Sequence, residues 1–295
     1  MRSSVPVSVV VSAYQEGDRV AETVRSVASA SVRPRQLVLV DDGSTDGSCV
    51  RDWPPWVRTL RGDHTGVAGA RNRGARAADQ PVLVFLDAHC AVDDGWLTPL
   101  LAALDHAPDA LVGPAVRDAS DSRFVGCGAE LVDPLLAYRW HPVAGPGPVE
   151  VGLLPGGCLA VARDRFLAAG GFGGFGAFSG FGLEDVELAL RWWRAGRPSL
   201  GVPGSVITHR FRTLPPYRPE QQPWLENILR TGLLHLPGPQ LRASVLACAR
   251  FSTFPGAIAT VLAEPWVAAQ QRLLATELRP TADFLDRWAP GAFPC

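Results

Sequence analysis

The chain lacks an excess of charge of either sign. Its 28 basic residues, all of them arginines, stand against 29 acidic ones, which leaves a formal net charge of −1. A protein that binds nucleic acid through the phosphate backbone carries a basic excess, so the balance argues against a nucleic-acid partner. Blocks of one sign, which mark charged tails, are also missing.

The six cysteines are scattered along the 295 residues, and no two are spaced as Cys-x-x-Cys. This pattern argues against a disulfide framework and favours reduced, mostly buried thiols of a cytosolic protein. No uninterrupted apolar run is long enough to cross a bilayer, and the first apolar run begins too early for a signal peptide. We therefore expect a cytoplasmic protein without a transmembrane segment.

The first 219 residues alternate between strand-like and helix-like segments. Strands are expected over residues 5–12, 36–40, 57–60, 82–86, 111–116, 156–161 and 205–209. Helices are expected over residues 18–30, 67–78, 96–104, 163–169 and 183–195. This alternation predicts an α/β fold, a Rossmann-like and mostly parallel sheet with helices on both faces.

Two segments in this part break the alternation. Residues 124–150 are irregular and proline-rich, which is typical of an inserted hairpin or a long loop. Residues 170–182 are glycine-rich with a phenylalanine at every third place, a period that fits neither helix nor strand. We expect a mobile loop with apolar anchors there.

From about Glu220 the chain turns helical, with helices expected over residues 224–236, 241–254 and 258–278. This divides the sequence into a first part, 1–219, and a helical C-terminal extension, 220–295. Packing on the first part is the simplest expectation for the extension. An acceptor groove, a dimer contact or a peripheral membrane contact are the alternatives for its apolar residues, which include Ile258, Val261, Leu262 and Trp266.

The stretch VLVFLDAHC, residues 82–90, carries the strongest sign of chemistry. Its apolar run suits a strand buried on both faces, and Asp87 and His89 follow at the carboxyl end, where open α/β sheets bind ligands. Residues two apart on an extended segment point the same way, so this carboxylate and imidazole could hold one cation. The alternative is an ordinary strand that ends in a turn.

A third ligand is needed, and His209 is the best candidate. It ends the last expected strand and is followed by Arg210 and Arg212, cations suited to phosphate oxygens. A set that mixes oxygen and imidazole ligands favours Mn²⁺ over Mg²⁺. Because neither a GxGxxG nor a Walker loop is present, such a cation is an alternative way to bind a diphosphate.

Asp42 also follows an expected strand, within Asp41-Asp42-Gly43-Ser44. A carboxylate there suits the ribose hydroxyls or the base edge of a nucleotide. The alternative is a plain turn, since Asp-Gly-Ser is common turn chemistry.

Six stretches match a known family in order and spacing over roughly residues 5 to 217. They are VVVSAYQEGD (9–18), LVDD (39–42), ARNRGARAADQPVLVFLDAHC (70–90), PGGCLAVARDRF (155–166), GFGLEDVELALRWWRAG (180–196) and HRFRTLPPY (209–217). Through them the chain resembles the family-2 type glycosyltransferases of the GT-A fold. Its metal-binding side is similar to the polypeptide N-acetylgalactosaminyltransferases.

The resemblance implies roles for the donor-binding residues. Asp42 would bind uracil, with Ser12 and Tyr14 lining the base and ribose. Asp87, His89 and His209 would hold Mn²⁺ or Mg²⁺. Arg71 corresponds to an arginine near the donor sugar, and Glu184 to a carboxylate that contacts its hydroxyls. Gly156 and Gly157 correspond to a glycine pair that lets the backbone approach the sugar. Arg212 and Tyr217 correspond to two residues that hold the diphosphate or the loop over it. Phe181 corresponds to a tryptophan on a mobile loop.

Asp185 departs from this family, which has an asparagine there. The resulting Glu184-Asp185 pair is similar to the pair in many inverting family-2 enzymes, in which the aspartate is the general base on the acceptor hydroxyl. A retaining enzyme needs no such base. Asp185 and Glu184 are therefore the candidate catalytic residues, and inverting and retaining outcomes both stay open.

The resemblance thus implies a metal-dependent transfer of a hexose or N-acetylhexosamine from a UDP-sugar to an acceptor hydroxyl. A peptide or a secondary metabolite is the expected acceptor, and a cell-envelope glycan is the alternative. From other classes, a sugar nucleotidyltransferase or a non-catalytic binding module remains open. The acceptor and the oligomeric state cannot be read from the sequence.

Overall fold

The computed structural model describes residues 3–121, 123–174, 178–212, 220–265, 275 and 277–293. Its centre is a sheet with the strands β1 (Ser3–Ala13), β2 (Val32–Asp41), β3 (Val57–Arg61), β4 (Val82–Asp87), β5 (Cys90–Val92), β6 (Leu111–Asp118), β7 (Val125–Leu131), β8 (Tyr138–Pro142), β9 (Val149–Glu150), β10 (Cys158–Ala162) and β11 (Ser199–His209). The main path is β3-β2-β1-β4-β10-β6-β11-β5. Strands β3, β2, β1 and β4 are parallel, β11 is parallel to β6, and β10 runs antiparallel between β4 and β6. The expected α/β class with a central sheet flanked by helices is confirmed, but the sheet is mixed rather than mostly parallel: in the described part, four pairings between named strands are parallel and six are antiparallel.

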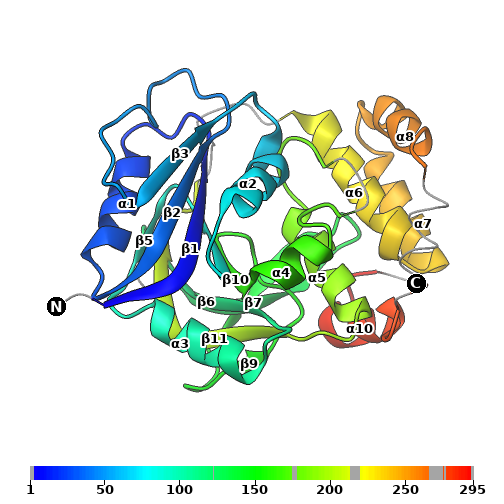
Figure 1. Cartoon of the computed structure of the whole chain (residues 1–295). Coiled ribbons are helices and arrows are strands. Elements are labelled where there is room, and N and C mark those ends of the chain that lie inside the picture. The colour runs from blue at the N-terminus through cyan, green and yellow to red at the C-terminus, as the bar shows by residue number, and fades with distance from the viewer. Residues whose placement is uncertain are drawn as a thin grey trace.

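Helices cover both faces of this sheet (Figure 1). They are α1 (Arg19–Ser29), α2 (Gly66–Ala77), α3 (Leu97–His106), α4 (Arg163–Ala168), α5 (Glu184–Arg194), α6 (Gln221–His235), α7 (Gly238–Cys248), α8 (Phe254–Leu262) and α10 (Thr281–Trp288). Successive residues of β1 enter different cores: Val9 packs with residues of α1 and α3, and Val10 with residues of α2, α4 and α5. Because strand side chains alternate between faces, a strand that is apolar at both positions is covered on both sides.

One strand begins well before its expected start. β11 begins at Ser199, six residues before the expected start, because its pairing with β6 shifts between Val202 and Val206 and so accommodates the turn-like residues Pro203 and Gly204. The irregular segment 124–150 contains the antiparallel hairpin of β7 and β8 and the short β9, which agrees with the inserted-hairpin reading. The sequence gives no sign of β5.

The extension is helical, as expected, but the bounds of its helices differ. The expected helix over 241–254 is shorter, because α7 ends at Cys248. α8 begins at Phe254, four residues before the helix expected over 258–278, and Pro255 lies in its first turn, a position that proline favours. Side chains of α6, α8 and α10 share one core with α5, and α6 contacts α5 directly. Of the apolar residues singled out, Val261 is buried and Leu262 is exposed. Trp266 lies outside the described residues.

The glycine-rich segment has the expected anchors where it is described. Phe172 and Phe178 are buried, whereas 57% of Phe181 is exposed. Phe175 lies outside the described residues, and the mobility of the segment stays a prediction. Among the described residues, we find no helix with the length and apolar character needed to span a bilayer. The cysteines at 49, 90, 127, 158 and 248 are buried and free, and Cys295 is outside the described part.

Candidate functional site

The carboxyl ends of β1, β2 and β4 meet at the point where the strand order reverses. Chain order runs outward from β1 to β2 and β3 on one side, and β4 lies on the other side. Ser12 pairs with Asp87 across β1 and β4, and Ala13 pairs with Asp41 across β1 and β2. Open α/β sheets bind ligands at such a switch point. The predicted nucleotide and metal residues therefore share one edge of the sheet.

Asp87, His89 and His209 form a group that could hold a metal ion. One ligand atom from each lies within 4.8 Å of the others. His209 Nε2 is 3.3 Å from Asp87 Oδ2, and the two imidazole rings lie edge to face with centroids 4.7 Å apart. The strand β5 brings them together, because Cys90 pairs with His209 at the end of β11 and so draws the preceding His89 beside it. The structure thus brings the three predicted ligands together.

The surroundings of these side chains fit a divalent cation. A Cβ atom on Gly157 would lie 3.0 Å from His209 Cδ2 and 3.8 Å from Asp87 Oδ2, so a side chain there would crowd the group. Burial would raise the pKa of Asp87, but Arg71 and His209 outweigh it and hold the pKa well below its usual range. An ionised carboxylate with two imidazoles is a donor set that suits Mn²⁺.

Arg71 is a buried connection between the metal group and α5. Its guanidinium donates to Asp87 Oδ1 at 2.7 Å and to Glu184 Oε1 at 3.0 Å, and it also donates to the carbonyl oxygen of Gly156. Only 2% of the residue is exposed. A Cβ atom on Gly156 would lie 2.8 Å from Arg71 Nη1, so the glycine leaves room for the guanidinium. Arg71 therefore holds the carboxylates of Asp87 and Glu184 in place. It is also the residue that is predicted to lie near the donor sugar.

Glu184 and Asp185 begin α5 beside this arginine. Glu184 is buried, and its Oε2 has no hydrogen-bond partner among the described residues. Burial and the neighbouring charge of Asp185 raise the pKa of Glu184 to about 7. Asp185 Oδ2 accepts the N–H of Gly156 at 2.8 Å, and burial raises the pKa of Asp185 above its usual value. Both acids thus hold protons more tightly than exposed carboxylates do.

The raised pKa of Glu184 predicts a pH-dependent stability. The pKa of a glutamate carboxyl is near 4.5 in the unfolded chain, whereas that of Glu184 is about 7 in the fold. The folded state therefore binds more protons across that window, and stability falls as the pH rises through it. In Glu184→Gln, which removes the titration, we expect Tm relative to the wild type to rise by about 5 °C from about pH 5 to about pH 8, measured by thermal unfolding.

Asp46→Asn is the matched control for this experiment. Burial would raise the pKa of Asp46, but hydrogen bonds from Ser48 and Gly17 hold it below its usual range, so its ionisation does not change in that window. Its Tm difference from the wild type should stay constant. A constant difference for Glu184→Gln as well would contradict the raised pKa.

Asp42 binds the start of α2. Its carboxylate accepts hydrogen bonds from the N–H groups of Thr65 and Gly66 at 3.0 and 2.9 Å, and from the Thr65 hydroxyl at 2.9 Å. The ring of His64 lies 2.9 Å from the same carboxylate and stacks on Tyr14 with centroids 4.0 Å apart. The carboxylate thus stabilises a helix N-terminus beside an aromatic pair that could line a base, and its role in binding the base stays a prediction.

Glu16 is a site residue that sequence reasoning missed. It is buried, forms a bidentate ion pair with Arg212, and its Oε1 lies 3.3 Å from His89 Nδ1. Burial would raise the pKa of Glu16, but the neighbouring His89 and Arg212 hold it below its usual range. A carboxylate on the second ring nitrogen orients a metal-binding imidazole. The sequence offered one sign of this role, because Glu16 is an acidic residue within the matched stretch 9–18. Tyr217 lies outside the described residues.

An aromatic cluster next to the metal group was also missed. Phe124, Trp140 and Phe211 lie within 6.3 Å of one another by ring centroid, Tyr138 contacts Trp140, and Phe211 contacts His209 at 4.4 Å. We call these four residues the aromatic wall. The spacing of Tyr138 and Trp140 on one strand face was the signal.

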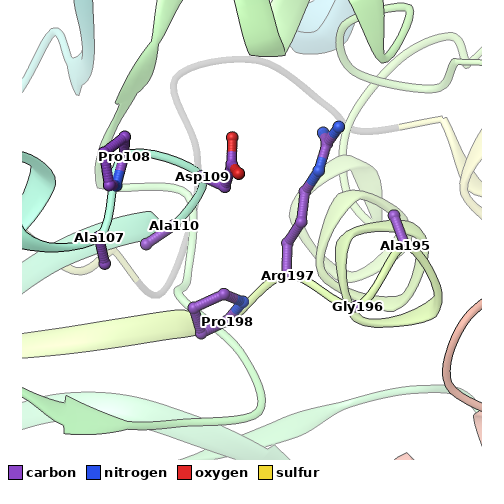
Figure 2. Close-up of a pocket in the computed structure, with 8 residues that line it drawn as sticks. All are labelled: Ala107, Pro108, Asp109, Ala110, Ala195, Gly196, Arg197 and Pro198. Atoms are coloured by element: carbon purple, nitrogen blue, oxygen red, sulfur yellow. The ribbon is translucent and has the colours of Figure 1, made fainter.

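A pocket of about 330 Å³ lies at the other end of the strands. Its residues, 107–110 and 195–198, directly precede β6 and β11, and Figure 2 shows Asp109 and Arg197 rising from opposite walls. Asp109 pairs with Arg165 at 2.9 Å, and the guanidinium of Arg197 lies over Trp192. Because ligands of such sheets bind at the carboxyl ends of the strands, we place the active site at the metal group instead.

Comparison with known proteins identifies the family of the matched domain. The family described as "Glycosyl transferase family 2" matches residues 8–133. Polypeptide N-acetylgalactosaminyltransferase 4 of Caenorhabditis elegans is 30% identical over 236 residues, which cover 72% of this chain and 39% of that protein. Polypeptide N-acetylgalactosaminyltransferase 11 of Xenopus tropicalis is 31% identical over 237 residues, 71% of this chain and 39% of that protein. The chain thus spans about two fifths of the length of these relatives.

Solved structures share the fold. The crystal structure of GalNAc-T7 with UDP, GalNAc and Mn²⁺ superposes with a TM-score of 0.78 at 22% identity, over 98% of this chain and 58% of that chain. The structure of S. aureus TarS residues 1–349 with UDP-GlcNAc gives a TM-score of 0.54 at 13% identity, over 92% of this chain and 81% of that chain. The matched family and the fold agree: the chain carries a glycosyltransferase family 2 domain with a GT-A-like fold and is similar to the polypeptide N-acetylgalactosaminyltransferases.

Proposed function

We propose that the protein transfers a sugar from a UDP-sugar to a hydroxyl group of a peptide, with the help of a divalent cation. The grouping of Asp87, His89 and His209 at the switch point of the sheet carries this proposal. The names of the curated relatives and the UDP, GalNAc and Mn²⁺ bound by GalNAc-T7 support a UDP-N-acetylhexosamine as donor. A secondary metabolite or a cell-envelope glycan is the alternative acceptor.

The residues at this edge have the properties that such a transfer needs. Asp87, His89 and His209 would hold the cation, which supplies positive charge to offset the charge that builds on the departing diphosphate. Arg212 pairs with Glu16, which lies beside His89. Its guanidinium is a group that can bind phosphate oxygens in a bidentate manner. Arg71 keeps Asp87 ionised, and the buried Oε2 of Glu184 is available to a sugar hydroxyl.

The aromatic wall supports a peptide acceptor. Phe211 and Tyr138 are each 38% exposed, and the wall adjoins the metal group through the contact of Phe211 with His209. Exposed aromatic side chains beside a polar reaction centre can bind apolar peptide side chains with little loss of conformational entropy. An acceptor hydroxyl presented there would lie near Asp185, the candidate base.

A screen of nucleotide sugars tests the donor and the cation together. We expect UDP-N-acetylhexosamines with Mn²⁺ to raise Tm, and chelation to remove the increase, since a ligand that binds only the folded state stabilises it. Transfer is then read by mass spectrometry on serine- and threonine-containing peptides. Release of pyrophosphate from a nucleoside triphosphate would point instead to a nucleotidyltransferase. A protein that binds the UDP-sugar but shows neither transfer nor Mn²⁺-dependent hydrolysis of it would be a non-catalytic module.

Asp42→Ala is expected to weaken uridine binding by about 10- to 150-fold even without a cation, because a base edge would lose a charged acceptor worth about 1.5–3 kcal/mol. Calorimetric titration with UDP in the presence of a chelator measures it. Thr65→Ala is the matched control, since it removes a hydrogen bond from Asp42 at the start of α2 but keeps the carboxylate. Equal weakening in both variants, or no change in Asp42→Ala, would displace Asp42 from the base site.

A cytoplasmic location stays a proposal. The buried, free cysteines of the described part are its support, because such thiols persist in reducing compartments. Cell fractionation of the tagged protein tests it, and recovery of the protein in a secreted or luminal fraction would contradict it.

A further inference from the structure

The turn before α5 is held between two helices. The N–H of Val67, at the start of α2, donates to the carbonyl oxygen of Gly180 at 3.1 Å. Gly66 approaches so closely that a Cβ atom there would lie 2.3 Å from the same oxygen. On the other side, Cβ atoms on Gly180 and Gly182 would meet Pro223 and Trp224 of α6 at 3.1 and 3.4 Å. Residues 179–182 thus pack against α2, which binds Asp42, and against the C-terminal extension.

Asn227 of α6 binds both ends of this turn with one side chain. Its Nδ2 donates to the carbonyl oxygens of Ser179 and Gly182 at 2.9 and 3.0 Å, on either side of Phe181. Only 1% of Asn227 is exposed. The carbonyl groups of Ser179 and Gly182 therefore share the amide of Asn227 as their donor.

The orientation of the amide is fixed by its other partner. Arg230 Nη1 donates to Asn227 Oδ1 at 3.1 Å, and guanidinium nitrogens can only donate, so the oxygen must face Arg230 and the nitrogen the turn. Arg230 is itself held by Glu226 at 3.1 Å and by Glu264 at 2.8 Å. A buried charged network thus aims the Asn227 amide at the turn.

The turn leads directly into the acids of α5. Leu183, between Gly182 and Glu184, has a φ of 72° and is buried. A branched residue in this left-handed region costs about 1 kcal/mol or more and persists only where its neighbours hold it. Asn227 binds the carbonyl group of Gly182, one residue before Leu183. It therefore restrains the strained backbone at Leu183, which places Glu184 and Asp185.

We propose that Asn227 is a positioning residue of the transferase, one that fixes the turn 179–182 and thereby the placement of Glu184 and Asp185. This inference rests on the proposed glycosyl transfer. It makes the extension part of the catalytic unit, because α6 supplies a contact that the first 219 residues lack.

Two variants of the full-length chain test the proposal. Asn227→Ala removes both hydrogen bonds to the turn, and Asn227→Asp keeps an acceptor for Arg230 but cannot donate to the carbonyl groups. In both, we expect kcat for transfer to fall by about 10- to 100-fold, because small misplacements of catalytic groups are costly. The Kd of Mn-UDP should stay within about twofold, because Asp87, His89 and His209 are untouched.

Ile228→Ala is the matched control. It lies next to Asn227 on α6, is fully buried, and should lower Tm by creating a cavity while leaving the turn hydrogen bonds in place. We expect kcat of this variant to stay close to that of the wild type. Near-normal kcat in both Asn227 variants, or an equal loss of kcat in Ile228→Ala at a similar Tm, would overturn the proposal.

Hydrogen exchange separates this inference from the proposed function. Amide exchange of Val67, whose N–H donates to Gly180 in the turn, should quicken by about tenfold or more in Asn227→Ala and not in Ile228→Ala, since local opening is governed by local hydrogen bonds. This measurement needs no substrate. Unchanged exchange in Asn227→Ala would overturn the positioning role even in an active enzyme, whereas a wild type that transfers no sugar would overturn the proposed function alone.

Discussion

Replacing Asp87 or His89 with alanine is expected to abolish metal-dependent binding of UDP. Each substitution removes one of three ligands that lie within 4.8 Å of one another, and a cation held by two ligands is bound far more weakly. We expect the Kd of Mn-UDP to rise by about 100-fold or more, since loss even of an outer partner of a metal ligand costs about 10- to 100-fold. Calorimetric titration with UDP, with and without Mn²⁺, measures the change.

Asp87 also has a structural role that the experiment must separate. It is the partner of the buried Arg71, and removal of one member of a buried pair destabilises a protein by about 3–5 kcal/mol. Asp87→Asn is the matched variant, because an amide oxygen can still accept from Arg71 while the anionic ligand is lost. Mn-UDP binding that is unchanged in His89→Ala and Asp87→Asn would remove the metal group from the proposed site.

Asp185→Asn is expected to reduce transfer by about 100- to 10,000-fold if the reaction inverts, because the acceptor hydroxyl loses its general base. Donor binding should be spared, since Asp185 contacts the backbone N–H of Gly156 rather than the predicted metal ligands. Turnover with a peptide acceptor, together with the Kd of Mn-UDP, measures both quantities. The anomeric configuration of the product, read by NMR, reports the stereochemical outcome directly.

Asp185→Ala is the useful companion to this variant. An asparagine oxygen can keep the hydrogen bond from Gly156, whereas alanine loses both the base and that bond. Equal loss in both variants is expected if the base matters most. Near-normal turnover in Asp185→Asn with a product of retained configuration would contradict the role as base and assign Asp185 to holding the Gly156 backbone.

Much of the sheet could be predicted because local pattern reflects the fold. The buried strands β1, β2 and β4 are near-continuous apolar runs, and Asp42 and Asp87 follow two of them. In a parallel sheet the carboxyl ends of neighbouring strands share an edge, so these acids were expected to lie together. The early start of β11 and the three-residue β5 were missed, because a bulge hides one pattern and three residues carry no period.

The pairing of side chains could not be read in the same way. Glu16 binds Arg212 across 196 positions, and Asn227 binds the turn at Ser179 across 48. Neither contact leaves a periodic signal, since its energy depends on where two distant segments meet. Arg71 was assigned to the donor sugar by resemblance alone, and its ion pairs with Asp87 and Glu184 emerge only from the folded arrangement.

The sequence by itself determined the α/β class, the acids at the strand ends and the three metal-ligand candidates, because strand burial and strand termini are local properties of the chain. The tertiary structure alone decided that β5 pairs with β11 and so sets His89 beside His209, that Arg71 joins the metal group to α5, and that α6 holds the turn before Glu184. These contacts join residues far apart in the chain, and their formation depends on burial and geometry that arise only when the whole core packs.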